Sequence, residues 1–437
     1  MTREEDSGGA FRLEAPLPAL EQAGRSPAAR RALAALPEYA PMVERLDRAA
    51  GWSRGRLSRL AVDRLYGRRV SMSASRMDKY KSCHFSYFMR YGLQAEPRKP
   101  AGFTAPEYGT FVHYVLEHVL RDEMFQQTVL PGFSDPVAGA EGRRRLRELT
   151  RAAVDRYVAE ELGGLEQQTE RFRYLFRRLL RSVQAVVDNV AEELAASQFR
   201  PISFELGFGS GQDLPPVELS VDGVTISVTG FVDRVDGWVH DGRLYLRVVD
   251  YKTGQKRLNL REVYCGLDCQ MLLYLFSLTR DPSGRFTGAE PAGVLYLLAD
   301  PAPENTTRAK AAQPVEYSLD GLVRDEQRVF DAMDADRTGR YLPFRYRGDA
   351  PSPFQKDKRA DEAKIERIRQ HLDELVEQMG QQLYDGRIEA APLVSGRSPC
   401  LWCDYSLICR HETGVGEREL EAPQKPFEPE KKEEEEA

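Results

Sequence analysis

Residues 230–254 read GFVDRVDGWVHDGRLYLRVVDYKTG, and this stretch predicts the centre of the fold. Val224 to Val239 has the β-branched, alternating character of a strand, and Arg243 to Lys252 forms a second such run. The residues between them, His240-Asp241-Gly242, contain the Asp-Gly pair that favours a tight hairpin turn. We therefore expect an antiparallel hairpin in the middle of a sheet.

Three charged side chains of this hairpin are candidates for catalysis. Asp233 lies near the middle of the first strand, and Asp250 and Lys252 lie at the end of the second. Residues two apart in a strand share a face, so Asp250 and Lys252 project together and Tyr251 projects to the other side. Two carboxylates and one ammonium suit a site that holds a divalent cation and activates water. The alternative is a solvated salt bridge of little energetic consequence.

Length and charge limit the classes of function. The chain has 437 residues, enough for more than one folding unit. Its 62 basic and 68 acidic residues nearly balance, and residues 416–437, with nine acidic and four basic residues, carry five of the six net negative charges. Any nucleic-acid surface must then be local. Since no apolar run reaches membrane-spanning length and no signal-peptide core is present, we expect a soluble, cytoplasmic protein without membrane partners.

The order of predicted elements is α/β. Residues 1–27 are expected to be disordered, 28–70 to form short helices, and 413–437 to form a disordered acidic tail. Strands are predicted at 202–208, 217–221 and 292–298 in addition to the hairpin. Helices are predicted at 74–91 and from about 108 through 119. Further helices are predicted at 142–162, 165–196, 261–278, 319–335 and 363–383.

Two further pairs of residues have a functional and a structural interpretation. His113 and Glu117 lie four apart on one helix face, and a neutral imidazole can add a nitrogen ligand to Mg²⁺ or Mn²⁺. Gln270 and Tyr274 also lie four apart and are able to direct polar groups toward the site or DNA. A structural histidine and a tyrosine at the edge of the core are the alternatives.

Six cysteines fall into two groups. Cys400, Cys403 and Cys409 cluster, and with the distant Cys83 they offer four thiolates, enough for an iron–sulfur cluster or a zinc site. A set of unliganded thiols is the other alternative. Cys265 and Cys269 are expected to be small buried residues.

The predicted helices at 142–162 and 165–196 are rich in arginine with interleaved aromatic residues. Such helices either follow a phosphate backbone or present solvated faces, in which arginine stems cover apolar surface. The phosphate-binding motif of ATPases, Gly-x4-Gly-Lys-Ser/Thr, is absent from the sequence, so the chain is not expected to hydrolyse ATP by itself.

Taken in order, the motifs resemble those of the PD-(D/E)XK nuclease superfamily, in its RecB-like branch with a cysteine-ligated cluster. The similarity extends over residues 60–412 and looks closest to the C-terminal nuclease region of the B subunits of AddAB-type helicase–deoxyribonucleases. The motifs that carry it are SASRMDKYKSC at 73–83, GTFVH at 109–113, GFVDRVD at 230–236, VDYKTG at 249–254, Gln270 with Tyr274, and the cysteine triplet.

The resemblance implies a role for each motif residue. His113, Asp233, Asp250 and the Tyr251 carbonyl would be ligands of Mg²⁺ or Mn²⁺, Lys252 the catalytic lysine, and Gln270 and Tyr274 supporting residues. Cys83, Cys400, Cys403 and Cys409 would hold a [4Fe-4S] cluster. The implied fold is a restriction-endonuclease-like α/β core over 71–412, a mixed sheet flanked by helices with a helical insertion at 142–196, preceded by a helical remnant of a helicase-like region at 28–70.

The implied function is metal-dependent exonucleolytic hydrolysis of DNA, on single-stranded ends delivered by an ATP-dependent helicase/nuclease partner, in double-strand-break repair. Two alternatives stand beside it. One is a CRISPR-associated iron–sulfur adaptation exonuclease, whose motifs look similar in a shorter chain. The other is a catalytically silent scaffold subunit that binds DNA ends.

Overall fold

The structure is a computed structural model that describes residues 27–50, 55–96, 105–133, 135, 138–164, 169–221, 223–252, 257–281, 283–298 and 319–429. The chain divides into two compact units, Met1–Arg56 and Leu57–Ala437. The first contains α3 (Pro27–Ala34) and α4 (Ala40–Ala50). The predicted helical segment 28–70 is therefore split, because α5 (Arg59–Tyr66) and β1 (Arg69–Ser73) belong to the second unit. Of the segment 1–27 predicted to be disordered, residues 1–26 lie outside the described residues, and Pro27 begins α3.

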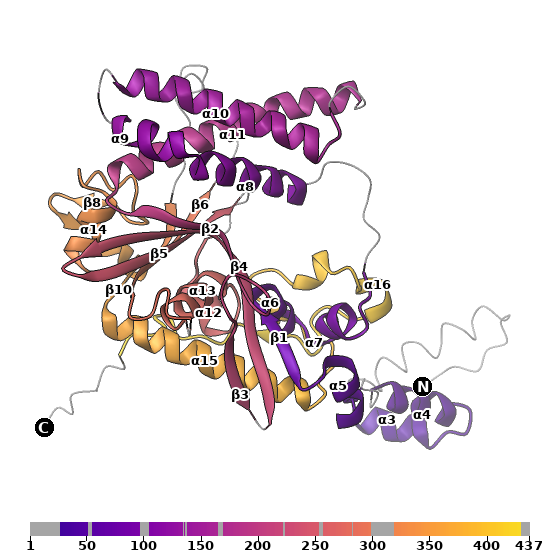
Figure 1. Ribbon diagram of the computed structural model, residues 1–437. Helices are drawn as coiled ribbons and strands as arrows, with labels where there is room; N and C mark the ends of the chain where they lie inside the picture. Colours follow the sequence, from indigo (N-terminus) through magenta and orange to yellow (C-terminus); the bar gives the residue numbers. More distant parts are fainter. Residues whose placement is uncertain are drawn as a thin grey trace, which may run out of the picture. The chain divides into compact units, whose positions relative to one another are not determined.

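A mixed sheet forms the centre of the second unit (Figure 1). Its strand order is β1–β4–β5–β6–β7–β10, and β2 (Arg200–Phe208) and β3 (Val217–Val221) both pair antiparallel with β4. The remaining strands are β4 (Val224–His240), β5 (Arg243–Lys252), β6 (Glu290–Leu298), β7 (Leu319–Arg324) and β10 (Arg359–Ala360). The predicted hairpin is confirmed: β4 and β5 are antiparallel, and its turn residues Asp241 and Gly242 have φ of 50° and 75°.

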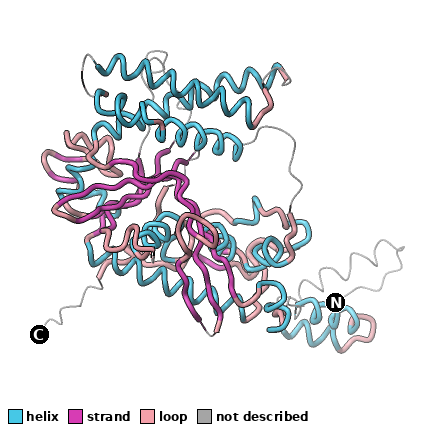
Figure 2. The backbone as a smooth tube through the Cα atoms, in the orientation of Figure 1, coloured by secondary structure: helices cyan, strands magenta, loops and turns pink. Residues whose placement is uncertain are grey.

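Helices cover both faces of the sheet (Figures 1 and 2). On one face lie α8 (Ala105–Arg121), α10 (Ala138–Glu160) and α11 (Glu170–Ala196), joined by η2 (Phe125–Val129) and α9 (Leu130–Gly132). On the other lie α6 (Ala74–Ser82), α12 (Leu260–Tyr264), α13 (Gln270–Thr279) and α15 (Glu362–Tyr384). Alternate side chains of β5 enter the two cores: Val248 packs with the α13 side and Val249 with the α8 side.

Two of the predicted helices are broken at cysteines. The helix expected at 74–91 ends at Ser82, Cys83 is extended, and the chain resumes as α7 (His84–Tyr87) and the π-helical turn η1 (Phe88–Gly92). The helix expected at 261–278 is divided into α12 and α13 by the turn around Gly266.

The prediction of a helix over 319–335 is wrong in its first half. Residues 319–324 form β7, and only α14 (Gln327–Met333) is helical. Both faces of β7 are covered, since Leu322 packs in one core and Val323 in the other. A short strand buried on both faces lacks the polar–apolar alternation by which a strand is recognised.

The C-terminal segment differs from the expected disorder as far as it is described. Residues 418–419 form β12, which pairs in parallel with β11 (Leu393–Val394). Phe427 is buried against Tyr264 and His371, and Lys364 Nζ lies 2.8 Å from Glu428 Oε1. Residues 430–437 lie outside the described part. Short elements complete this region: β8 (Tyr346–Arg347), β9 (Ala350–Pro351), η4 (Pro353–Lys358), η5 (Pro399–Trp402) and α16 (Ser406–Cys409).

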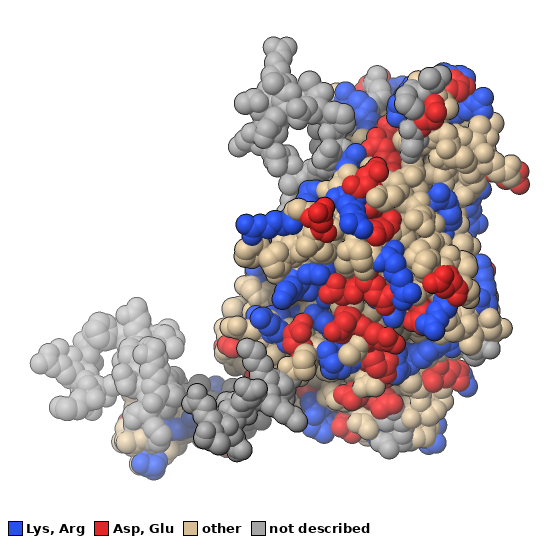
Figure 3. Space-filling model, turned by 90° about the vertical axis from the view of Figure 1, so that its left-hand side faces the viewer, with Lys and Arg blue, Asp and Glu red and all other residues tan. Residues whose placement is uncertain are grey.

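Charged side chains on the surface are mostly intermixed in sign. On the face shown in Figure 3, basic and acidic groups alternate over short distances. On the helical layer, Arg144 and Arg145 pair with Glu141, and Arg173 pairs with Glu170, so these arginines are partly neutralised by their own helices. Within the described residues, no helix is long and apolar enough to cross a membrane.

A buried ionic cluster joins α11 to the hairpin. Arg234 donates to Glu193 Oε2 at 2.8 Å and lies 2.9 Å from Asp236 Oδ1, while Arg247 donates to Asp236 Oδ2 at 2.8 Å and to Glu193. None of the four side chains is more than 2% exposed. A buried charge is tolerated only when it is paired, so each member depends on the other three.

We predict that Arg247→Met destabilises the protein by about 3–5 kcal/mol, because Asp236 and Glu193 must then share Arg234 and one buried negative charge is left uncompensated. Denaturant unfolding would measure this change. The matched control is Arg337→Met, which breaks the exposed ion pair with Asp331 and should shift the unfolding midpoint little. Equal shifts for the two variants would contradict the prediction.

Candidate active site

The pairing of β4 with β5 brings two carboxylates to one place. Arg234 pairs with Val249 and Val235 with Val248, so the next pair along the register sets Asp233 opposite Asp250. Lys252, two residues beyond Asp250 on the same face, holds its Nζ 2.6 Å from Asp250 Oδ2. Asp250 is nearly buried and Lys252 is partly exposed, so the ammonium marks the side of the site that faces solvent.

The imidazole of His113, on α8, closes the site from the helical side. Its Nε2 donates to the carbonyl oxygen of Tyr251 at 2.9 Å, and its Nδ1 lies 3.4 Å from Asp233 Oδ2. Asp233 Oδ2 also accepts from the backbone N–H of Tyr251 at 3.0 Å. The peptide of Tyr251 is thus held at both ends, by the carboxylate and by the imidazole.

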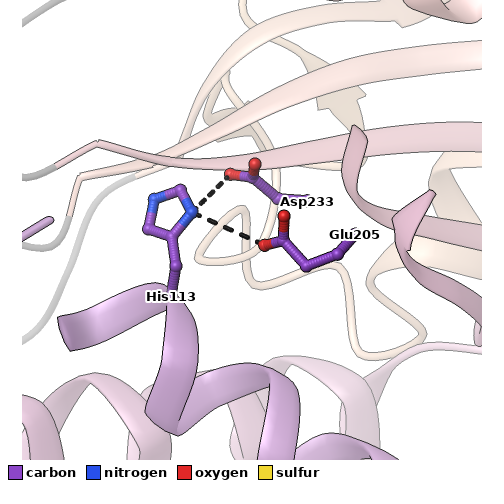
Figure 4. A group of neighbouring side chains, drawn as sticks. All are labelled: His113, Glu205 and Asp233. Carbon is purple, nitrogen blue, oxygen red and sulfur yellow. Dashed lines mark ion pairs between the residues drawn. The ribbon is translucent and has the colours of Figure 1, made fainter. Parts of the chain in front are cut away.

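Glu205 is a site residue that the sequence did not reveal. On β2, Phe204 pairs with Arg234 and Leu206 with Val232, so Glu205 lies opposite Asp233. Its Oε1 is 3.8 Å from His113 Nδ1 (Figure 4). One ligand atom each from His113, Glu205 and Asp233 lies within 4.8 Å of the other two. One nitrogen and two carboxylate oxygens at this spacing fit the ligands of Mg²⁺ or Mn²⁺.

The backbone at Glu205 supports a special role for this residue. Its φ is 44°, in the left-handed region, although it lies in the interior of a strand. Such a conformation costs a non-glycine residue on the order of 1 kcal/mol or more and is concentrated at functional sites. No pattern in RPISFELGF indicates it, because the pairing partner of Glu205 lies 28 residues away in the sequence.

The charges of the site are coupled. Burial alone would lower the pKa of His113, but the carboxylates of Glu205 and Asp233 and the Tyr251 carbonyl outweigh it and raise the pKa to about 9. Burial and the neighbouring Asp250 carboxylate raise the pKa of Asp233 to about 8, against the lowering effect of His113. Without a metal the site therefore retains protons near neutral pH, and a bound cation would replace them.

Gln270 and Tyr274 lie behind the site, on α13. Tyr274 is buried, and hydrogen bonds connect it with the Gln270 side chain and with the backbone of Phe231. Its ring lies directly against Gly230, where a Cβ would be 2.4 Å from Tyr274 Cε1. This pair therefore fixes β4 close to Asp233.

All four cysteines predicted as ligands line one cavity of about 130 Å³. The members are Cys83, Cys400, Cys403 and Cys409. Cys83 occupies the break between α6 and α7, where burial raises the pKa of its thiol while hydrogen bonds from the backbone at Ser86 and Phe85 lower it. Among the described residues, no three cysteine sulfurs lie within 4.8 Å of one another.

The other two cysteines are separate from that cavity. Cys269 is fully buried, and Cys265 Sγ donates to the carbonyl oxygen of Glu421 at 3.5 Å. Neither lines the cavity. The expectation of a small buried residue is confirmed for Cys269, whereas Cys265 is only half-buried.

Comparison with known proteins identifies similar chains. Proteins named as the B subunit of an ATP-dependent helicase/deoxyribonuclease resemble the chain. That of Thermoanaerobacter sp. (strain X514) is 30% identical over 362 residues, which are 80% of this chain and 31% of that protein. That of Clostridium novyi (strain NT) is 29% identical over 87% of this chain and 33% of that protein. That of Symbiobacterium thermophilum is 32% identical over 82% of this chain and 31% of that protein.

The chain thus spans about a third of the length of these relatives. A family match covers most of the chain itself: residues 71–410 match the family described as the PD-(D/E)XK nuclease superfamily. This range contains every residue of the site and all four cysteines of the cavity. The chain therefore belongs to the PD-(D/E)XK nuclease superfamily.

Proposed function

We propose that the chain is a metal-dependent deoxyribonuclease that hydrolyses phosphodiester bonds at the edge of the β4–β5 hairpin. The observation that carries the proposal is the convergence of His113, Asp233 and Glu205, with the Asp250–Lys252 pair adjoining them. These groups come from a helix and three strands, so only the folded chain assembles them.

His113, Asp233 and Asp250 would hold a Mg²⁺ or Mn²⁺ ion. Glu205 would add a further carboxylate, and the Tyr251 carbonyl oxygen would be a further ligand. The bound cation would supply Lewis acidity toward the phosphate and lower the pKa of water. Lys252 would orient the attacking water and offset charge on the phosphoryl group through its ammonium, held in place by Asp250. Gln270 and Tyr274 would keep β4 in position.

The names of the relatives support a proposal for the biological setting. They are called subunits of an ATP-dependent helicase/deoxyribonuclease, and this chain has no phosphate-binding motif of an ATPase. We propose that it acts as an exonuclease on single-stranded DNA ends delivered by a helicase partner, as a hetero-oligomer in double-strand-break repair.

The cysteine cavity is proposed to hold a [4Fe-4S] cluster. All four cysteines line one cavity of about 130 Å³, although they come from parts of the chain more than 300 residues apart. Four thiolates match the number of protein ligands of a [4Fe-4S] cluster, which is the group that the resemblance implies.

Asp250→Asn should abolish Mg²⁺-dependent degradation of single-stranded DNA while leaving the fold intact, because the carboxylate that neighbours Asp233 and holds Lys252 is lost. Release of labelled nucleotides would measure it, with unfolding curves as the check of the fold. Asp241→Asn, in the exposed hairpin turn, is the control and should cleave like the wild type. Cleavage by Asp250→Asn at the wild-type rate would refute the proposal, and an inactive wild type that binds DNA ends would favour the silent scaffold.

Metal binding should strengthen as the pH rises. The pKa values of about 9 for His113 and about 8 for Asp233 mean that protons compete with the metal near neutrality, so affinity increases until both have been released. Calorimetric titration with Mn²⁺ in buffers of different ionisation enthalpy would count the protons. In Glu205→Gln, which removes a carboxylate that raises the pKa of His113, the dependence should be shallower. Affinity that falls with rising pH would contradict this ligand set.

The cysteine site predicts a visible chromophore. Protein purified without oxygen should be brown and contain iron and acid-labile sulfide, and Cys403→Ser should lose most of both. Cys265→Ser is the matched control, because its sulfur lies outside the cavity, and it should retain the chromophore. Stoichiometric zinc in colourless protein would overturn the iron–sulfur assignment and leave the nuclease assignment untouched.

A further inference from the structure

A second cavity, of about 330 Å³, is lined mainly by cationic and polar groups. Its basic residues are Arg257, Arg340, Arg345 and Lys358, and Asp320 is the only acidic residue among the described residues that line it. None of these residues belongs to the metal or cysteine centres described above. An excess of positive charge in a concave site favours an anionic ligand.

The cavity lies at the same edge of the sheet as the candidate active site. Asp320, at the start of β7, pairs with Tyr296 of β6, and Tyr296 pairs with Asp250 of β5. The three residues therefore form one row across neighbouring strands. With strands about 4.8 Å apart, the wall of the cavity at Asp320 lies about 10 Å from Asp250.

Two of the four basic residues are already committed to carboxylates. Lys358 Nζ lies 2.6 Å from Asp320 Oδ1, which neutralises the acidic residue of the lining. Arg340 Nη2 lies 2.6 Å from Glu192 Oε2 on α11. These pairs shape the walls and contribute little net charge.

Arg257 and Arg345 carry the uncompensated charge. Within the described part of the chain neither forms an ion pair, and both are exposed. The Arg345 side chain donates one hydrogen bond, to the Gly339 carbonyl at 3.3 Å, which leaves other guanidinium donors for a ligand. Arg257 follows Lys252, the last residue of β5, by five positions in the sequence.

We propose that this cavity is a subsite for a backbone phosphate of the DNA strand, next to the phosphate that is cleaved. This inference rests on the proposed nuclease function and names the residues that hold the strand, Arg257 and Arg345. A separation of about 10 Å is on the order of one to two nucleotides of an extended strand. Guanidinium groups suit the ligand, because their planar forks donate two hydrogen bonds to a phosphate.

The first experiment measures binding without cleavage. In the Asp250→Asn background of the full chain, the affinity for a single-stranded oligonucleotide is measured at increasing salt, alone and with Arg257→Ala or Arg345→Ala. Each lost phosphate contact should reduce the slope of log affinity against log salt by about 0.7. The matched control is Arg347→Ala, an exposed arginine of β8 that does not line the cavity, and it should keep the slope.

The second experiment locates the phosphate. Here the protein keeps Asp250, so that it can cleave. It is tested on a series of oligonucleotides, each with a single neutral methylphosphonate at a different position on either side of the cleaved bond. The wild type and Arg347→Ala should show a raised KM, with little change in kcat, when the neutral group lies one or two nucleotides away. Arg257→Ala and Arg345→Ala should have a raised KM already and respond to that substitution less.

The outcomes separate this inference from the proposed function. If wild-type protein cleaves DNA but both cavity variants match Arg347→Ala in salt slope and in methylphosphonate response, the subsite is refuted and the nuclease stands. If wild-type protein does not cleave, yet the salt slope falls only in the cavity variants, the catalytic proposal fails and the phosphate site stands. Unfolding curves identify any variant that is misfolded, and Arg257→Lys and Arg345→Lys, which keep the charge, should restore most of the slope.

Discussion

The site depends on the register in which β4 pairs with β2 on one side and β5 on the other. This register places Glu205, Asp233 and Asp250 side by side on three neighbouring strands. A slip of one residue in either pair would turn a carboxylate to the opposite face of the sheet. The tight Asp241-Gly242 turn, whose residues both have positive φ, leaves the hairpin little freedom to slip.

On the opposite face of the hairpin, buried ion pairs stabilise the same register. Arg234, which follows Asp233, and Arg247 are locked to Glu193 of α11 and Asp236 by the buried ionic cluster. Arg234 Nη1 also donates to the Tyr251 hydroxyl at 3.2 Å. Tyr251 is thereby held by its side chain on one face, while its peptide contacts Asp233 and His113. Helix α11 is thus held against β4 and β5 by paired charges as well as by apolar packing.

The elements that could be predicted from the sequence are those whose signal lies within a few neighbouring residues. The hairpin followed from an Asp-Gly pair between two β-branched runs, and its ends agree with the prediction to within a residue. The convergence of Cys83 with the C-terminal triplet followed from the number and grouping of the cysteines together with the resemblance. By contrast, Glu205 was missed because its meaning depends on a strand partner far along the chain. β7 was missed because burial on both faces removes the alternation that marks a strand.

In the C-terminal segment, composition predicts disorder although two side chains anchor the chain to the folded core. Residues 413–429 are rich in charge and proline, which favours disorder, yet Arg418 donates to the carbonyl oxygens of Ala391 and Lys81, and Phe427 enters the core beside Tyr264. Burying one phenylalanine contributes about 2 kcal/mol, and the hydrogen bonds of the half-buried Arg418 guanidinium to carbonyl oxygens add to this. Both anchors lie close in sequence to the cysteine triplet. Because Arg418 donates to the carbonyl oxygen of Lys81, at the end of α6 just before Cys83, the segment links the two parts of the chain that line the cysteine cavity.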